Sequence, residues 1–186
     1  MAAPTLLVIS DTHGDTETLA LVLSWAKQQN AIGALVFTGD GAADIPIALA
    51  KTGYHPPAIH MVRGNGDGDP RLPLVETITV GERRLLLTHG HVQAVHDGLD
   101  RLVATAQTME VEGVLYGHTH RPFWEEIGGC LFLNPGSLGK PRGKEGPTFA
   151  TIEIPASGWF IIQYYHITEG PFGGRTIKKI DLFGSP

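Results

Sequence analysis

Cysteine is nearly absent from this sequence, which contains only Cys130 among its 186 residues. An internal disulfide is therefore excluded, which favours a reducing compartment and predicts a cytoplasmic location. No apolar run approaches the ~20 residues that a membrane-spanning helix requires. The N-terminus also lacks a basic region followed by a long apolar stretch, so we expect neither a signal peptide nor a membrane span.

Positive charge is also scarce, because 14 lysine and arginine residues face 19 aspartate and glutamate residues, giving a net charge of -5. Bulk, sequence-independent binding of nucleic acid needs clustered lysine and arginine and is not expected. Hydrophobic residues make up 42% and charged residues 18%, which is typical of a folded protein rather than a disordered one. The length suits one hydrophobic core, so we predict a single domain over residues 1–186.

Short apolar runs alternate with helical patterns in the first half of the chain, whereas the second half consists mostly of further apolar runs. Apolar residues at helical spacing predict helices between Asp15 and Asn30, from Asp44 to Lys51 and from Leu99 to Met109. Strands are expected at 6–9, 34–38, 58–62, 74–80, 84–88, 114–116, 123–127, 130–133, 148–154, 159–167 and 176–182. This order predicts an α/β domain of two mixed sheets packed together, with the helices outside.

Five of the expected strands end in side chains that can bind a metal ion. These side chains are Asp11 and His13, Asp40, Asn65, His89, and the pair His118 and His120. In open α/β sheets, ligands bind beyond the carboxyl ends of the strands. Taken singly, each residue has an ordinary interpretation, such as a helix cap for Asp11, a turn former for Asp40 or a left-handed turn residue for Asn65. Their coincidence at five strand ends favours one shared site.

The histidine pair His118 and His120 follows an apolar run through Gly117, where a strand can turn. In an extended backbone, residues two apart project to the same side, about 6.6 Å from each other along the strand. This spacing suits two neighbouring metal ions, whereas a helix would place the two histidines on different faces. We therefore predict that both histidines bind metal from an extended chain.

The chemistry of these side chains narrows the choice of metal. The set contains carboxylate, imidazole and amide groups but no thiolate, which favours manganese, iron, cobalt, nickel or zinc over soft metals. Seven side chains are too many for one ion. Two ions about 3.5–4 Å apart that share a carboxylate would use them all, and this is the usual arrangement for in-line displacement at phosphorus.

The motifs together closely resemble the calcineurin-like metallophosphoesterase superfamily, and in particular its small bacterial and archaeal phosphodiesterase branch. The matching elements are Asp11-x-His13, Gly39-Asp40, Gly64-Asn65, His89 in His-Gly-His, and Gly117-His118-Thr119-His120. The resemblance implies a four-layer α/β/β/α sandwich. It also implies one ion on Asp11, His13 and His120, a second on Asn65, His89 and His118, and Asp40 as the bridging ligand, with manganese expected first.

This resemblance implies a phosphodiesterase in which a hydroxide between the two ions attacks the phosphorus of a small-molecule phosphoester. One position departs from the pattern, because Gly66 stands where the superfamily commonly has a histidine that assists the leaving group. We therefore expect a preference for good leaving groups, such as aryl phosphodiesters. If another residue supplies the proton, His91 and Asp67 are the first candidates, although His91 also suits the role of orienting a metal ligand.

Two other functions remain open at this point. The retromer subunit of the same superfamily works as an assembly component, so a scaffold that binds a protein partner is one alternative. In that subunit one histidine of the region matching His118 to His120 is lost, whereas this sequence keeps the full ligand set, which favours an enzyme. A phosphomonoesterase or nucleotide pyrophosphatase would use the same metals and is the second alternative.

Several remaining residues receive secondary assignments. The segment from Asn134 to Ser137 is expected to shape the site rather than to catalyse, and Arg142, in a basic loop, is a candidate to contact phosphate. Phe160 and Tyr164 belong either to the core, which is favoured, or to a homo-oligomer interface. Four histidines lie away from the predicted rim or lack a matching partner and receive no role: His55, His60, His96 and His166.

Overall fold

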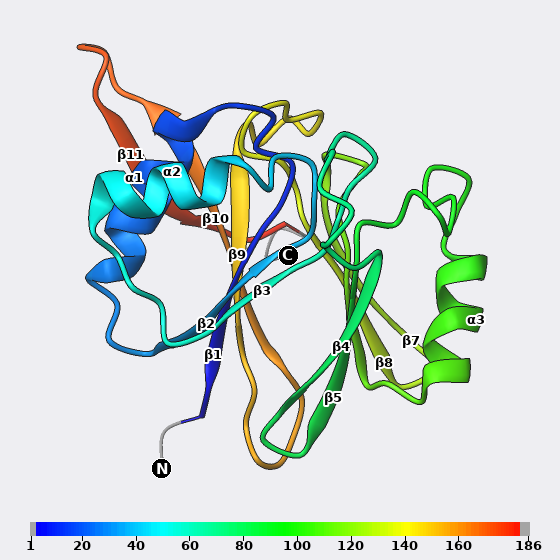
Figure 1. The fold of residues 1–186 in the computed structure, drawn as a ribbon. Coiled ribbons are helices and arrows are strands. Elements are labelled where there is room, and N and C mark those ends of the chain that lie inside the picture. Colours follow the sequence, from blue (N-terminus) through cyan, green and yellow to red (C-terminus); the bar gives the residue numbers. More distant parts are fainter. Residues whose placement is uncertain (1–2, 183–186) are drawn as a thin grey trace.

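The computed structural model describes residues 3–182, which form two β-sheets flanked by helices (Figure 1). The helices are α1 (Thr16–Lys27), α2 (Asp44–Thr52) and α3 (Asp100–Met109). The strands are β1 (Thr5–Ile9), β2 (Ile32–Phe37), β3 (Ile59–Met61), β4 (Val75–Val80), β5 (Arg83–Thr88), β6 (Gly113–Leu115), β7 (Pro122–Ile127), β8 (Cys130–Pro135), β9 (Thr148–Glu153), β10 (Ile161–Glu169) and β11 (Arg175–Ile180). Within the described residues, no helix is both long enough and apolar enough to cross a membrane.

Both sheets are mixed, as the alternating pattern predicts. The first sheet has the order β11-β10-β9-β1-β2-β3, and its strands β1, β2 and β3 run parallel to one another. The second sheet has the order β4-β5-β6-β8-β7, with β5, β6 and β8 parallel. Each sheet therefore presents the carboxyl ends of neighbouring parallel strands along one edge.

Three layers of apolar side chains hold four layers of secondary structure together. In β1, Leu6 and Val8 face the second sheet, whereas Leu7 and Ile9 face α1 and α2. Because β1 is covered on both sides, its sequence is continuously apolar instead of alternating. On the far side, Leu86, Val114 and Phe132 of the second sheet pack against Leu102 and Ala106 of α3. The α/β/β/α sandwich is confirmed, with α1 and α2 on one flank and α3 on the other (Figure 1).

Local signals place most element ends to within one residue, whereas the start of β2, the end of β8, both ends of β10 and the end of β11 are each missed by two. Asp15 caps α1 by accepting a hydrogen bond from the Thr18 N–H at 2.9 Å, and Gly53 ends α2 in the left-handed conformation with a φ of 60°. The expected end of β8 at 133 is wrong, because Asn134 and Pro135 continue the strand opposite Phe123 and Pro122. Pairing with a neighbouring strand decides such ends, and this pairing is not visible in the local sequence.

The two sheets are also joined by a buried hydroxyl group. Tyr164 on β10 places its Oη 2.8 Å from the carbonyl oxygens of Phe123 on β7 and Asn134 on β8. The Tyr164 residue is only 3% exposed, and Phe160 is 7% exposed. The core assignment of these two aromatics is therefore confirmed, and their alternative assignment to an oligomer interface is wrong.

We expect the substitution Tyr164→Phe to lower the free energy of unfolding by about 1–2 kcal/mol, because two buried carbonyl oxygens would lose their shared donor. Urea denaturation measures the change. The control is Tyr165→Phe on the same strand, since the Tyr165 hydroxyl makes no hydrogen bond within residues 3–182 and its loss leaves no partner unpaired. Equal destabilisation by both substitutions would contradict a hydrogen-bonded link between the sheets.

Candidate metal centre

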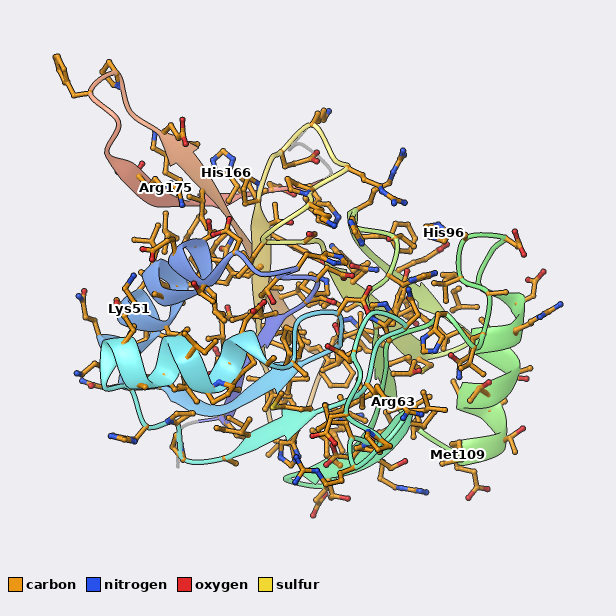
Figure 2. All side chains as sticks on the ribbon, turned by 45° about the horizontal axis from the view of Figure 1, so that its top comes forward. Lys51, Arg63, His96, Met109, His166 and Arg175 are labelled. Carbon is orange, nitrogen blue, oxygen red and sulfur yellow. The ribbon has the colours of Figure 1, made fainter. Side chains whose placement is uncertain are left out.

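Six of the predicted ligands meet where the carboxyl edges of the two sheets come together. Asp11 and His13 follow β1, and Asp40 follows β2, all in the first sheet. His89 follows β5, and the pair of histidines follows β6, in the second sheet. Figure 2 brings this upper edge forward, with Lys51 of α2 and Met109 of α3 on opposite flanks. The site therefore lies between the sheets at their common upper edge.

The first group of donors surrounds the carboxylate of Asp11. Its Oδ1 atom lies 3.1 Å from His120 Nε2 and 3.7 Å from His13 Nε2, and these two ring nitrogens are 3.2 Å apart. All three side chains offer a donor atom within 4.8 Å of one another. This group contains the same three residues that the family resemblance implies for one ion.

A second group of donors forms around Asp40 and His89. His89 Nε2 lies 3.6 Å from Asp40 Oδ2 and 3.9 Å from Asp11 Oδ1, and His118 Nδ1 lies 3.2 Å from His89 Nε2. Asp40 Oδ2 is also 3.8 Å from His13 Nε2 in the first group. Both carboxylates therefore lie between the two sets of imidazoles, which is the position a bridging ligand occupies.

Two of the imidazole rings are oriented by backbone carbonyl groups. His89 Nδ1 lies 2.7 Å from the Thr38 carbonyl oxygen, and His120 Nδ1 lies 2.7 Å from that of Lys140. A carbonyl oxygen only accepts, so each Nδ1 carries the proton and donates it. In the neutral ring, Nε2 then has a lone pair on the side of the carboxylates, which is the usual arrangement of a metal-binding histidine.

The backbone is strained at five of the six converging residues. Asp11, His13, Asp40, His118 and His120 have φ values of 53°, 46°, 61°, 71° and 58°. Left-handed conformations of residues other than glycine cost free energy and concentrate at functional sites. The prediction that His118 and His120 lie on extended chain is therefore wrong. Each residue instead turns through the left-handed region, so that His118 approaches His89 and His120 approaches Asp11.

Glycine is required at position 117, just before the histidine pair, because the backbone there passes close to the side chains that follow β1. A Cβ atom added there would collide with Ser10 Oγ and lie 2.8 Å from Asp11 Oδ2. The same carboxylate oxygen accepts a hydrogen bond from the His118 N–H at 3.1 Å. Only glycine lets the loop after β6 reach the carboxylate after β1, which brings the two sheets' ligands together.

The electrostatics fit bound cations. Burial raises the pKa of Asp11, but the interactions with the His120 and His13 rings outweigh burial and hold that pKa well below its usual value. Burial, together with the charges of His89 and His96, lowers the pKa of His118 to about 4. Burial lowers the pKa of His89, but the carboxylates of Asp40 and Asp11 outweigh burial and raise that pKa. The ionised carboxylate of Asp11 and the neutral imidazole of His118 are the forms that bind metal.

One atom in particular tests whether a metal fits. Asp11 Oδ1 is buried and has no hydrogen-bond partner among the described residues. Such an orphaned charged oxygen is costly unless something else satisfies it. The Nε2 atoms of His120, His13 and His89 lie around it at 3.1, 3.7 and 3.9 Å, which is a cluster of nitrogen and oxygen donors about one point. These residues therefore fit a divalent cation.

The other predicted site residues are placed less centrally. The side chain of Asn65 is exposed and makes no contact with the six converging residues within the described part of the chain, and its φ is not left-handed. The ring centroid of His91 lies 5.4 Å from that of His89 and 6.1 Å from that of His118, and its buried Nδ1 has no partner among residues 3–182. Arg142 is exposed, and its backbone N–H donates to the His120 carbonyl oxygen at 2.9 Å.

Asp67 holds the backbone of the loops around the site, and neither of its carboxylate oxygens is left free. Its carboxylate accepts hydrogen bonds of 2.8–2.9 Å from four backbone N–H groups, those of Asp40, Gly41, Ala42 and Gly64. All four acceptor positions of the carboxylate are therefore filled. Asp44 does the same for the first loop by accepting from Thr12 Oγ1 at 2.5 Å and the Gly14 N–H at 2.8 Å. In the sequence, the signal for these two supporting residues is a carboxylate a few residues after a predicted ligand: Asp67 follows Asn65 by two positions, and Asp44 follows Asp40 by four.

His96 is a residue that the sequence analysis missed. Its ring centroid lies 4.5 Å from that of His118, so the prediction that it stays away from the rim is wrong. His96 comes from the loop before α3 (Figure 2), and no local pattern reports how that loop folds back. In contrast, His60 pairs with Glu76 at 2.9 Å, away from the site.

The segment from Asn134 to Ser137 shapes the site, as expected. Asn134 Nδ2 donates to the Gly117 carbonyl oxygen at 2.8 Å and to Thr119 Oγ1 at 3.1 Å, on either side of His118. Ser137 Oγ donates to the Asp11 carbonyl oxygen at 2.7 Å. These contacts fix the two loops that carry ligands from different sheets.

Comparison with known proteins identifies the family of the chain. Residues 5–157 match the family model described as the calcineurin-like phosphoesterase superfamily domain, and the chain therefore belongs to this family. It is 30% identical over 152 residues to probable metallophosphoesterase YsnB of Bacillus subtilis, covering 80% of this chain and 83% of the relative. It is 29% identical over 167 residues to phosphodiesterase YfcE of Escherichia coli K12, covering 80% and 86%.

Solved structures share the fold across almost the whole chain. A predicted phosphoesterase from Streptococcus pneumoniae superposes with a TM-score of 0.74 at 30% identity, covering 97% of this chain and 99% of that one. Wild-type Vps29 from Entamoeba histolytica, complexed with zinc, superposes with a TM-score of 0.71 at 25% identity, covering 95% and 98%. The family thus includes proteins named as phosphoesterases and proteins named for vacuolar sorting.

The substitution Asp67→Asn should lower the free energy of unfolding by about 2–3 kcal/mol, because an amide nitrogen would face backbone N–H groups that need an acceptor. Manganese affinity should fall about 10- to 100-fold, since the loop carrying Asp40 loses its anchor. Urea denaturation and calorimetric titration with Mn²⁺ measure the two effects.

The matched control is Asp69→Asn in the same loop, where the carboxylate accepts from the exposed Arg71 side chain at 2.8 Å and from one backbone N–H, that of Arg71, at 3.0 Å. Its effect on stability should stay within about 0.5 kcal/mol. Unchanged metal binding in Asp67→Asn would show that the loop does not depend on this anchor.

Proposed function

We propose that this protein is a metal-dependent phosphodiesterase of small-molecule phosphoesters, with two divalent ions at the site between the sheets. The observation that carries the proposal is the buried Asp11 Oδ1, which has no hydrogen-bond partner among the described residues and lies 3.1 Å from His120 Nε2 and 3.9 Å from His89 Nε2. Asp11, His13 and His120 would hold one ion and His89 and His118 the other, with Asp40 between them. Asn65 is the proposed third ligand of the second ion, for which its exposed side chain would turn toward His89 and His118. The position of Asp40 Oδ2, within 3.8 Å of both His13 and His89, supports this bridging role.

When bound, such ions lower the pKa of water and neutralise the charge that develops on phosphoryl oxygens. The residues of the chain hold and aim this chemistry. Gly66 donates its N–H to Asp40 Oδ1 at 2.6 Å, which leaves Asp40 Oδ2 turned toward the imidazoles. Thr38 and Lys140 fix the rings of His89 and His120 through their carbonyl oxygens. Manganese is the first proposed ion, and nickel, cobalt, iron and zinc suit the same oxygen and nitrogen donors.

Three further parts of the proposal rest on narrower support. Diester rather than monoester hydrolysis is favoured by the similarity to YfcE, a protein named as a phosphodiesterase. The leaving group is proposed to depart without a proton donor at position 66. Of the two residues that could supply a proton instead, His91 is favoured over Asp67, because both oxygens of Asp67 are occupied by backbone N–H groups. A cytoplasmic location is proposed from the single Cys130, which excludes an internal disulfide.

The substitution His120→Ala should abolish most turnover, with kcat/KM falling at least about 100-fold, while the far-UV circular dichroism spectrum stays unchanged. The reason is that His120 Nε2 lies 3.1 Å from Asp11 Oδ1, whereas His120 itself lies in the loop between β6 and β7 and in no helix or strand. His55→Ala is the control, because His55 is exposed and its side chain makes no hydrogen bond or ion pair within residues 3–182. A scaffold would give the opposite result, with no turnover by the manganese-loaded wild type and partner binding retained in His120→Ala.

Across a series of aryl and alkyl phosphodiesters, log kcat should fall steeply as the pKa of the leaving alcohol rises. Gly66 carries no side chain and so no proton donor at the position beside Asp40. The series is measured with the manganese-loaded protein and with His91→Ala. If log kcat does not depend on the pKa of the leaving alcohol in the wild type, and falls steeply with it only in His91→Ala, His91 is the proton donor. The expectation that the leaving group departs without a proton donor would then be wrong.

A further inference from the structure

An apolar groove runs away from the metal centre along the outer edge of the first sheet. It has a volume of about 690 Å³ and lies between α2, β3 and the loop at 66–72. His13 and Asp40 line one end of it, so the groove is continuous with the donors of the metal centre. The apolar lining consists of Ile45, Pro46, Leu49, Ile59, Met61 and Leu72. Its volume lies within the range of ligand-binding pockets.

The charges of the groove disfavour an anionic occupant. None of the described residues that line it is lysine or arginine, whereas Asp67 and Asp69 lie on its rim. Arg71, in the same loop, donates to both carboxylate oxygens of Asp69, at 2.9 Å from Nε and 2.8 Å from Nη2, and is paired with it. A second phosphate or a carboxylate in the groove would find no lysine or arginine among the described lining residues and would meet the like charges of Asp67 and Asp69.

Two glycines leave the entrance to the groove open. At Gly68 a Cβ atom would meet nothing within 4 Å, and at Gly66 it would lie 3.1 Å from Asp40 Oδ1. Both glycines line the groove next to the metal centre. The absence of side chains at these positions therefore gives an extended substituent a path from the metal centre into the apolar part.

From these observations we infer that the groove binds a neutral, apolar organic arm of the phosphoester whose phosphorus lies at the metal centre. This inference rests on the proposed function and specifies its substrate class. Esters with an uncharged hydrocarbon arm are the favoured substrates, and esters whose arm carries further phosphate are disfavoured. Burial of the arm in the groove supplies affinity in proportion to the apolar area removed from water.

The first experiment keeps the chemistry at phosphorus constant. Manganese-loaded protein is given p-nitrophenyl phosphodiesters whose second arm is methyl, butyl or hexyl, or a hexyl chain that ends in phosphate. We expect kcat/KM to rise up to about fourfold for each buried methylene. For the ester with the phosphate-ended arm, kcat/KM should be at least about tenfold lower than for the ester with the hexyl arm. Binding of methyl-, butyl- and hexylphosphonate, measured by calorimetry, should follow the same order without requiring turnover.

The second experiment changes the groove by a surface substitution. Ile59 on β3 lines the groove and is 42% exposed, so Ile59→Lys places a cation there without cutting into the core. The preference for hexyl over phosphate-ended arms should shrink at least about tenfold, because the new cation pairs with the phosphate. Ile47→Lys is the matched control, since Ile47 lies on α2, is 55% exposed and does not line the groove, and it should leave the preference unchanged.

The outcomes separate the two proposals. Hydrolysis with a rate and a phosphonate affinity that are independent of arm length would overturn the groove assignment and leave the phosphodiesterase intact. The groove assignment would also be overturned if Ile59→Lys and Ile47→Lys changed the preference for the hexyl over the phosphate-ended arm by the same factor. No hydrolysis of any ester would overturn the proposed function and, with it, the assignment of the groove to a substrate arm.

Discussion

The burial of two carboxylates between the sheets is the constraint on which the rest of the structure depends. Asp11 and Asp40 are 0% and 4% exposed, and ionised groups so far from water are costly unless other groups compensate them. Compensation requires partners from both sheets, because the histidines around these carboxylates follow β1, β5 and β6. Hydrogen bonds from His89 to Thr38 and from the His118 N–H to Asp11 therefore also fix how the two sheets meet.

The local cost of this arrangement is met by the packing of the sandwich. Five site residues adopt left-handed conformations, each of which costs roughly 1–3 kcal/mol in a residue other than glycine. Such strain persists only where the surrounding structure holds it. Here the apolar layers on both faces of β1 hold the strand, and side chains such as Asp44, Asp67 and Asn134 hold the loops beyond the strand ends.

The loop after β3 serves both the metal centre and the groove. Its Asp67 anchors the backbone that carries Asp40, while Gly66 donates to the Asp40 carboxylate and leaves space beside it. The same stretch thus sets the direction of a ligand and opens the way into an apolar surface. A histidine at position 66 would occupy part of that space, so the departure from the family pattern bears on substrate shape as well as on proton transfer.

The sequence by itself determined the strand and helix cores and the identity of the residues at the strand ends. It could do so because burial on both faces makes a strand such as Leu6 to Ile9 continuously apolar, and because a capping residue such as Asp15 acts within one turn. Only the tertiary structure decided that His118 and His120 turn through the left-handed region, that His96 folds back onto His118 and that Asp67 gathers four backbone N–H groups. These features join segments distant in the chain, and local patterns carry no information on how such segments pack.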